Sequence, residues 1–485
     1  MTEPSHPDSS IDDLFETVVA GGYCIGCGAC AVARPDEIAT TIDRFGRIQA
    51  VRRREATTGA VGAVDPAAVC PFSGKGMNED EIGRRSFAQI ATSSFTPKIG
   101  FWTSLYAGYV TEDSYRINGS SGGMGSWIPA ELLRRGVVDF VLHVKPSHNA
   151  VNGLLFEYQV SRTVDDVRQG AKSRYYPCDL SQVLRHMCET PGRYALIALP
   201  CFSKAARLLA AHNPVVADRL RFVIALICGH LKSTAYARMY ALQTGVSPED
   251  LRYIDFRHKR PDATAKHYAI RIVSEHANER VESLTNNEAF FGTNWGHGFF
   301  KYQACDYCDD VVGETADVTI GDAWLPTYQG DPGGTNVIII RNRELDAMFA
   351  SAAAEKRIWL EPLPAEEIIR SQDAGFRHRH DGLAYRLLLK DRRNRWRPPK
   401  RIAPGRSHLT LRYRWLFRLR ELMRDESHRA FLEAVEKRDF SIFVRRMKVP
   451  LVAYNFVLRY MGIDGWKERL SRRVPLLRAR NPSRL

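Results

Sequence analysis

Three cysteines near the N-terminus form a C-x2-C-x2-C pattern, which constrains the local fold more than any other feature of the chain. The pattern consists of Cys24, Cys27 and Cys30, with Gly26 and Gly28 between them. Glycine adopts positive φ without steric cost, so the backbone here can curl tightly around a metal centre. Ferredoxin-type [4Fe–4S] clusters use triplets of this spacing. We therefore expect a short, loop-rich, ferredoxin-like segment that wraps around an iron–sulfur cluster.

The fourth ligand of such a cluster is often a cysteine followed by proline. Cys70-Pro71 is the only Cys-Pro pair in the chain, and 39 residues separate Cys70 from Cys30. The assignment of Cys70 therefore rests on its proline and not on close spacing. A structural zinc site is the alternative, but zinc sites usually use paired C-x2-C knuckles.

Two further cysteines follow apolar stretches that have the character of strands. Cys201 comes after Tyr194–Leu199, and Cys228 comes after Leu220–Ile227. Consecutive parallel strands end at the same edge of a sheet, which is where open α/β sheets place ligands. The two cysteines are thus expected to lie close together. Alternatively, they are buried small hydrophobes, as free cysteines often are.

A second C-x2-C pair, Cys305 and Cys308, lies close before another strand-like stretch. With the two strand-end cysteines it would make four thiolates, and spacing alone leaves open whether they form one site. Cys178 and Cys188 belong to no pattern, and we expect them to be structural.

Strand-like and helix-like stretches alternate between residues 100 and 240, which is typical of α/β proteins with parallel strands buried on both faces. Residues 250–345 are richer in strand candidates, and the chain is mostly helical after residue 345. The expected fold class is α/β with α+β elements, with a mixed central sheet and a helical, basic C-terminal region.

A Gly/Ser loop, Asn118–Gly123, lies between an expected strand and an expected helix. Backbone N–H groups in such a loop, together with a helix N-terminus, favour an anion. The loop matches neither G-x-G-x-x-G nor the Walker A motif. A dinucleotide or flavin phosphate is one interpretation, and an ordinary turn is the other. Lys172–Tyr175 adds cationic and stacking groups, or is an exposed basic stretch.

The net charge of +14 is concentrated at the C-terminal end. Residues 391–485 contain 26 Lys and Arg but only 9 Asp and Glu, whereas the other 390 residues contain 43 and 46. A basic tail of this kind indicates an anionic partner. An acidic electron carrier, an anionic membrane surface and nucleic acid are the three classes to consider.

An apolar stripe with arginines between its members runs through this tail. Leu411, Trp415 and Leu419 lie at helical spacing, as in helices that rest on anionic membranes. Packing of the stripe against the body is equally consistent with the pattern. Nucleic acid, suggested by Trp396, Tyr413 and Trp415, is less favoured because these aromatic residues also suit a helix core.

The first eight residues lack the basic and apolar regions of a secretory signal, and no uncharged apolar run approaches the roughly 18 residues of a membrane span. We expect a cytoplasmic protein, with the tail peripheral to the inner face of the membrane.

From about residue 20 to residue 342, the chain resembles the β-subunit family of coenzyme F420 hydrogenases and dehydrogenases, which also includes the plant hydroxymethyl-chlorophyll reductase. The resemblance departs at Phe202, where we expect Gln, and at Arg174, where Lys is commoner. The matching motifs are Cys24–Cys30 with Cys70-Pro71, Gly119–Gly123, Ser173–Tyr175, Leu199–Cys201, Cys228–His230, Cys305–Cys308 and Ala316–Trp324.

The resemblance implies an iron–sulfur flavoprotein. By motif, it implies a second [4Fe–4S] cluster on Cys201, Cys228, Cys305 and Cys308. His230 and Asp322 adjoin these motifs, either as proton-donor candidates or as packing residues. By motif, the FAD contacts would be Ser120, Ser121, Gly122, Gly123, Ser173, Arg174 and Tyr175.

Four segments follow from these patterns. They are an N-terminal iron–sulfur segment (1–95), an α/β flavin-binding domain (96–240), a β-rich segment that completes the second cluster site (241–345) and a helical basic region (346–485).

The expected function is that of an FAD- and iron–sulfur-dependent oxidoreductase. Single electrons from a donor such as ferredoxin would pass through clusters to FAD, which can deliver two electrons to a substrate. Some family members serve polysaccharide synthesis, so polysaccharide metabolism is one setting for that substrate. The alternatives are a non-catalytic electron-transfer β subunit of a hydrogenase or dehydrogenase complex, and a nucleic-acid-binding protein with a structural cluster.

Overall fold

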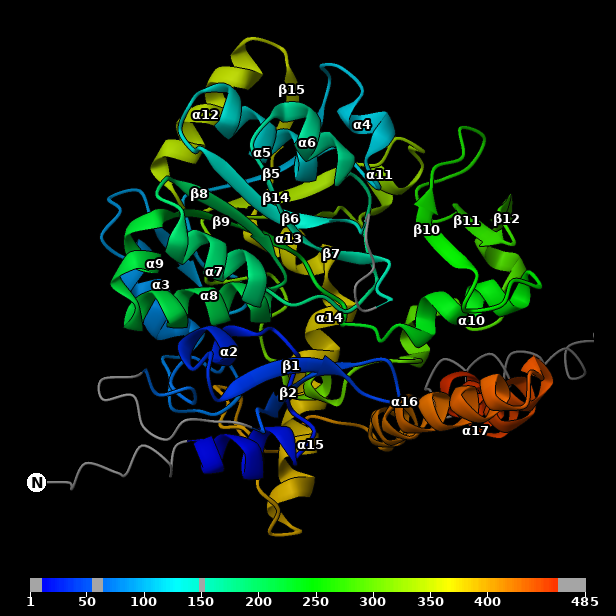
Figure 1. Cartoon of the computed structure of the whole chain (residues 1–485). Coiled ribbons are helices and arrows are strands. Elements are labelled where there is room, and N and C mark those ends of the chain that lie inside the picture. The colour runs from blue at the N-terminus through cyan, green and yellow to red at the C-terminus, as the bar shows by residue number, and fades with distance from the viewer. Residues whose placement is uncertain (1–10, 55–63, 148–152, 461–485) are drawn as a thin grey trace, which may run out of the picture.

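An eight-stranded mixed sheet forms the centre of the molecule in the computed structural model, which describes residues 11–54, 64–147 and 153–460 (Figure 1). The four strands β13, β9, β8 and β6 run parallel to one another, and the outer pairs are antiparallel. The strand order is β15 (Ile358–Pro362), β5 (Ser104–Val110), β14 (Asn336–Ile340), β13 (Val318–Asp322), β9 (Leu220–Leu226), β8 (Tyr194–Ala198), β6 (Phe140–Pro146) and β7 (Phe156–Ser161).

The parallel strands are almost entirely apolar because both of their faces are covered. In β9, Phe222 and Ile224 pack into one hydrophobic cluster, whereas Val223 and Ala225 point into another on the opposite face. This alternation confirms the prediction that the two apolar stretches around residues 194–199 and 220–227 are neighbouring parallel strands.

Helices cover both faces of the sheet (Figure 1). One layer contains α4 (Tyr115–Asn118), α5 (Met124–Arg134), α6 (Val164–Gln169) and α12 (Arg343–Ala354). The other contains α7 (Ser181–Glu189), α8 (Pro200–His212) and α9 (Pro214–Arg219). Pro200 is the first residue of α8, a position where the missing N–H is harmless and the fixed φ favours a helix.

The N-terminal segment is made of short elements, and its helix α2 and first hairpin lie below the sheet in Figure 1. They are η1 (Leu14–Val19), α2 (Ala29–Ala33), the hairpin of β1 (Ile38–Ile42) and β2 (Ile48–Arg52), α3 (Glu79–Phe87), and the hairpin of β3 (Ser94–Thr96) and β4 (Gly100–Trp102).

A separate three-stranded antiparallel sheet stands beside the main one, with α10 below it (Figure 1). Its strands are β10 (Leu251–His258), β11 (Ala269–His276) and β12 (Glu279–Asn286); α10 spans Ala235–Gln243. The short turns η2 (Asn287–Ala289), η3 (Trp295–His297) and η4 (Gln303–Tyr307) lead back to β13, and α11 (Pro326–Gln329) follows that strand.

The C-terminal region is helical, as predicted. The last two helices form an antiparallel hairpin, in which Arg412 Nη2 donates to the carbonyl of Leu458 at 2.7 Å. The region contains α13 (Ala365–Ser371), α14 (Asp373–Phe376), the π-helical turn η5 (Arg377–Asp381), α15 (Gly382–Asp391), α16 (Leu411–Glu436) and α17 (Phe440–Tyr460). Within the described ranges, no helix is both long and apolar enough to cross a membrane.

The predicted fold class is therefore confirmed, namely a mixed α/β protein with a large mixed sheet and a helical C-terminal region. The main sheet draws its strands from residues 104–226, 318–340 and 358–362, so it joins three of the four proposed segments. The segment boundaries themselves stay a prediction.

Candidate functional site

The first cysteine group surrounds a small cavity in the N-terminal segment. Cys24, Cys27, Cys30 and Cys70 all line this cavity. Gly26 and Gly28, the glycines of the triplet, have φ of 67° and 79°, so the chain uses the left-handed conformations that the glycines permit. Tight backbone turns at these glycines thus bring the three cysteines of the triplet together, and Cys70 lines the same cavity.

Burial raises the pKa of each thiol in this group, and neighbouring thiols add to the effect for Cys27, Cys30 and Cys70. Cys30 illustrates both causes, since burial comes first and then the proximity of the other three cysteines. The pKa of Cys70 rises to about 11. Such thiols stay protonated at neutral pH unless a cation takes the place of the proton.

The second cysteine group comes from three separate parts of the chain. Cys201 lies in the first turn of α8, Cys228 follows β9, and Cys305 and Cys308 lie in and directly after η4. The pKa of Cys201 is raised first by burial and then by Cys308, Cys228 and Cys305, so these three thiols lie near Cys201 in the core. The sheet edge therefore brings the strand-end cysteines together, as expected.

Asp306, the residue after Cys305, is fully buried and anchors the second cysteine group to the C-terminal helices. Its carboxylate contacts Lys301, His378 Nε2 at 3.0 Å and Arg424 Nη1 at 2.5 Å. Arg386 Nε donates to the Asp306 carbonyl at 2.7 Å. We call these residues the Asp306 clamp.

The positive and negative side chains of the Asp306 clamp shift one another's pKa values. Burial alone would raise the pKa of Asp306, but Lys301 and Arg386 hold it well below the usual range. Burial, together with Arg386 and Arg424, lowers the pKa of Lys301 even though Asp306 opposes that shift. The carboxylate is thus ionised among a surplus of cations.

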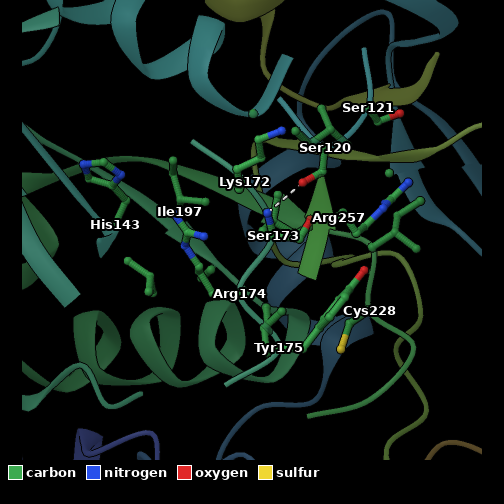
Figure 2. A pocket seen from close by; sticks show the side chains of 18 of the residues that line it. Ser120, Ser121, His143, Lys172, Ser173, Arg174, Tyr175, Ile197, Cys228 and Arg257 are labelled. Carbon is green, nitrogen blue, oxygen red and sulfur yellow. Dashed lines mark hydrogen bonds between the residues drawn. The ribbon is translucent and has the colours of Figure 1, made fainter. Parts of the chain in front are cut away.

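The Gly/Ser loop opens onto a cavity with a volume of about 270 Å³ (Figure 2). Ser120 Oγ accepts a hydrogen bond from the Ser173 backbone N–H at 2.8 Å, which joins the loop to the Ser-Arg-Tyr segment. Six of the seven predicted FAD contacts line this cavity: Ser120, Ser121, Gly123, Ser173, Arg174 and Tyr175.

Gly122, the seventh residue, is not part of the cavity lining. Its carbonyl accepts from the Val110 N–H of β5 at 2.8 Å. A Cβ at Gly122 would lie 2.8 Å from the Gly108 carbonyl oxygen and 2.7 Å from Asn336 Oδ1. Gly122 therefore seats the loop against the sheet, and its neighbours face the cavity.

Arg174 and Lys172 are held within the site and are not an exposed basic stretch. The Arg174 guanidinium lies over Phe156 at 4.6 Å and donates to Tyr253 Oη at 3.2 Å. Lys172 Nζ lies 3.7 Å from Asp255. Both side chains are thereby oriented beside the cavity.

Several cavity residues escaped the sequence reasoning, including His143, Arg257 and Trp295. Arg257 Nη1 donates to Asp322 Oδ2 at 2.6 Å, so Asp322 is committed to a partly buried ion pair. These residues come from β6, β10 and η3, and no motif signals them. The only sequence signal for their place at the cavity was that Asp322 and Arg257 lie at the ends of strands.

His230 stacks on Trp295 with ring centroids 4.2 Å apart. Burial is the first cause that lowers the pKa of His230 well below its ordinary value, and Lys232 is the second. The imidazole is therefore neutral at physiological pH. Its Nε2 is buried and has no hydrogen-bond partner within the part of the chain that the structure describes.

Tyr158 connects the two cysteine groups with the cavity. Its side chain lines the cavity and donates to the Ile197 carbonyl at 3.1 Å. Burial raises its pKa first, followed by the charges of Cys178, Cys201 and Cys27. Members of both groups therefore lie near one side chain at the cavity wall, and Cys228 lines the same cavity (Figure 2).

Cys178 and Cys188 lie outside both groups. Cys178 is buried, and its thiol donates to the Phe156 carbonyl at 3.6 Å, whereas Cys188 is half-buried beside Asn213. Across the described ranges, no three or more His, Cys, Asp or Glu side chains are arranged so that they could hold a metal ion. In a four-iron cluster each thiolate binds a different iron, so its ligands surround a cage and do not converge on one ion.

Two family models match the chain: the N-terminal part of the coenzyme F420 hydrogenase/dehydrogenase β subunit over residues 105–185, and its C-terminal part over residues 192–366. Among curated relatives, one of the subunits of the F(420)H(2) dehydrogenase from Methanosarcina mazei is 19% identical over 372 residues, which cover 73% of this chain and 88% of that protein.

Among solved structures, a chain of the F420-reducing [NiFe] hydrogenase complex from Methanosarcina barkeri is similar, with a TM-score of 0.46 and 12% identity. The similarity covers 65% of this chain and 100% of that one. The matched family regions contain the main sheet, the Gly/Ser loop and the second cysteine group. The chain therefore belongs to the coenzyme F420 hydrogenase/dehydrogenase β-subunit family.

Proposed function

We propose that the chain is an iron–sulfur electron-transfer subunit of an oxidoreductase complex, with a flavin held at the Gly/Ser loop. Membership of a β-subunit family supports an oxidoreductase role beside partner subunits. This is the alternative that the sequence left open, and family membership favours it over a free-standing flavoenzyme. A substrate in polysaccharide metabolism stays a prediction.

The observation that carries the proposal is that the second cysteine group and the Gly/Ser loop meet at one cavity, which Cys228 lines. Burial and then nearby thiols, among them Cys201 and Cys27, raise the pKa of Tyr158 at the wall of that cavity, which supports a place for the first group nearby. When bound, clusters supply one-electron transfer and a flavin supplies the exchange between one and two electrons. The chain's own residues would exclude water from the path and hold each group close to the next.

The residues present fit these groups. The thiols are buried or half-buried in two sets of four, and Arg379 Nε lies buried beside the second set without an acceptor in the described residues. A cluster would supply acceptor sulfurs there. For the flavin, the seated Gly/Ser loop and the aromatic Tyr175 border a cavity at a helix N-terminus, where an anionic phosphate is favoured.

Anaerobic purification of the full chain tests the proposal. We expect about eight irons, an equal amount of sulfide and one flavin per chain, because two sets of four thiols are present. Cys27→Ser and Cys228→Ser should each lower the iron content to about four. Reduced ferredoxin, an acidic one-electron carrier, should reduce the loaded protein at a rate that falls with salt.

Cys188→Ser is the matched control for these two variants, because Cys188 lies outside both groups, and its iron content should equal that of the wild type. About four irons in the wild type would remove the second site from the proposal. Zinc without sulfide would overturn the proposal altogether. If the isolated chain reduced a small molecule with no partner subunit, the free-standing enzyme would be correct instead.

Part of the basic tail pairs with the body and is not available to a partner. Arg401 Nη1 donates to Asp80 at 2.7 Å, and its Nη2 donates to Glu314 at 2.8 Å. Lys400 Nζ lies 3.3 Å from Asp309. Of the aromatic residues that suggested nucleic acid, Tyr413 stacks on Phe417.

The outer face of the α16–α17 hairpin, unlike the paired residues Lys400 and Arg401, contains exposed apolar side chains. The expected stripe is exposed at Leu411 (59%) and Trp415 (52%), whereas Leu419 packs partly against the core. The buried face of α16 instead contains Leu416, Phe417 and Met423. On α17, Val449, Val452 and Phe456 are also exposed, and Arg445 and Lys448 lie close to them in the sequence.

We propose that this outer face rests on an anionic membrane. The protein should then cosediment with phosphatidylglycerol vesicles and not with phosphatidylcholine vesicles. The double variant Trp415→Glu/Phe456→Glu should bind about tenfold or more weakly, because it removes two exposed aromatic side chains that the membrane would bury. Val281→Glu/Leu284→Glu changes two exposed apolar residues of β12 and should leave binding intact. Equal binding to both vesicle types would contradict the proposal.

A further inference from the structure

A buried arginine from beyond the matched family region reaches into the second cysteine group. Arg379 belongs to η5, whereas the family match ends at residue 366. Its Nη1 donates to Cys308 Sγ at 2.9 Å and to the Asp310 carbonyl, and its Nη2 donates to the Gly229 carbonyl at 2.9 Å. The side chain is only 2% exposed, so its position is defined by these contacts.

The charge of Arg379 is directed at the thiols and not at a carboxylate. Its hydrogen-bond acceptors are a thiol and two backbone carbonyls, and its Nε has no acceptor within the described ranges. A guanidinium stays charged in proteins, even when buried. Arg379 is therefore a fixed positive charge at the second group to which no carboxylate is bound. Lys400, Asp309 and Asp310 also lie close enough to Cys308 to affect its pKa.

The first cysteine group lacks such a donor. Cys24 Sγ accepts hydrogen bonds from the backbone N–H groups of Gly26 and Ala50, each at 3.4 Å. Of the residues whose placement is described, no Arg or Lys side chain donates to Cys24, Cys27, Cys30 or Cys70. Near the first group, Arg47 and Lys204 act on the pKa of Cys24 and Cys70 by charge alone. Among the described residues, the two groups thus differ in that a charged side chain donates a hydrogen bond to a thiol only in the second.

We propose that Arg379 raises the reduction potential of the cluster at the second cysteine group above that of the first. The inference rests on the proposed function. Reduction adds one electron, and hence one negative charge, to a buried site. A fixed cation and an N–H···S hydrogen bond stabilise that added charge. Electrons that enter at the first group would then move toward the second group and the cavity.

Redox titration of the full-length protein, monitored by electron paramagnetic resonance, tests this role. Arg379→Gln keeps hydrogen-bond donors but removes the charge. It should lower the reduction potential of one cluster by at least about 59 mV, which is a tenfold change in its one-electron equilibrium. Arg379→Lys retains the charge and should recover more than half of that shift. Arg377→Gln, which removes an exposed arginine paired with Asp373, should change neither potential.

Unchanged potentials in an Arg379→Gln protein that binds about eight irons would overturn the inference. If that variant binds only about four irons, the second cluster has been lost. The potentials of the two clusters in the wild type then test the inference instead. Cys27→Ser removes the first cluster and so identifies the signal of the second. A potential for the second cluster equal to or below that of the first would then overturn the inference. Failure of the wild type to bind iron and sulfide would instead contradict the proposed function.

Discussion

Asp306→Asn should destabilise the folded chain by about 3–5 kcal/mol, the effect typical of removing one partner from a buried ion pair. Lys301 and Arg424 would keep their charges in the core while their common carboxylate is lost. The free energy of unfolding, measured by chemical denaturation, reports this change. Because Asp306 lies between Cys305 and Cys308, iron content should also fall toward about four per chain.

Asp373→Asn is the matched control for this variant. Asp373 is 58% exposed and pairs with Arg377 in the same C-terminal region. Exposed pairs contribute roughly 0–1 kcal/mol, so this substitution should alter stability little and iron content not at all. Equal stabilities of the two variants would show that the Asp306 clamp does not hold the second cysteine group in place.

Gly122→Ala should weaken flavin binding by about a hundredfold or more, which is about 2.8 kcal/mol. The added Cβ would lie 2.8 Å from the Gly108 carbonyl oxygen, and β5 cannot move because it is hydrogen-bonded on both sides. The loop must therefore move, together with the N–H groups before α5. Flavin titration followed by fluorescence quenching measures the loss.

Gly330→Ala provides the comparison, since a Cβ at Gly330 meets nothing within 4 Å. Its flavin affinity should equal that of the wild type. Asn336 connects the same region to α5, because its Oδ1 accepts from the Met124 N–H at 3.3 Å. If Gly122→Ala bound flavin normally, the Gly/Ser loop would not be the phosphate cradle that we propose.

Local sequence patterns predicted much of this molecule. The alternation of apolar stretches indicated the neighbouring strands β8 and β9, because strands buried on both faces must be apolar throughout. The same topology indicated that Cys201 and Cys228 meet, since parallel strands end at one edge. The apolar stripe of the tail is divided in the structure, with Trp415 exposed and Leu419 partly packed against the core. Helical spacing alone cannot tell which side of an amphipathic helix meets the body.

The sequence by itself determined the triplet of the first cysteine group, because the C-x2-C-x2-C spacing and its two glycines act within seven residues of chain. Only the tertiary structure decided what surrounds the second group. Asp306 meets Arg386 and Arg424 across 80 and 118 positions, and Arg379 reaches Cys308 across 71. Contacts at such separations have no periodic signal, because they depend on how whole helices pack and not on neighbouring residues.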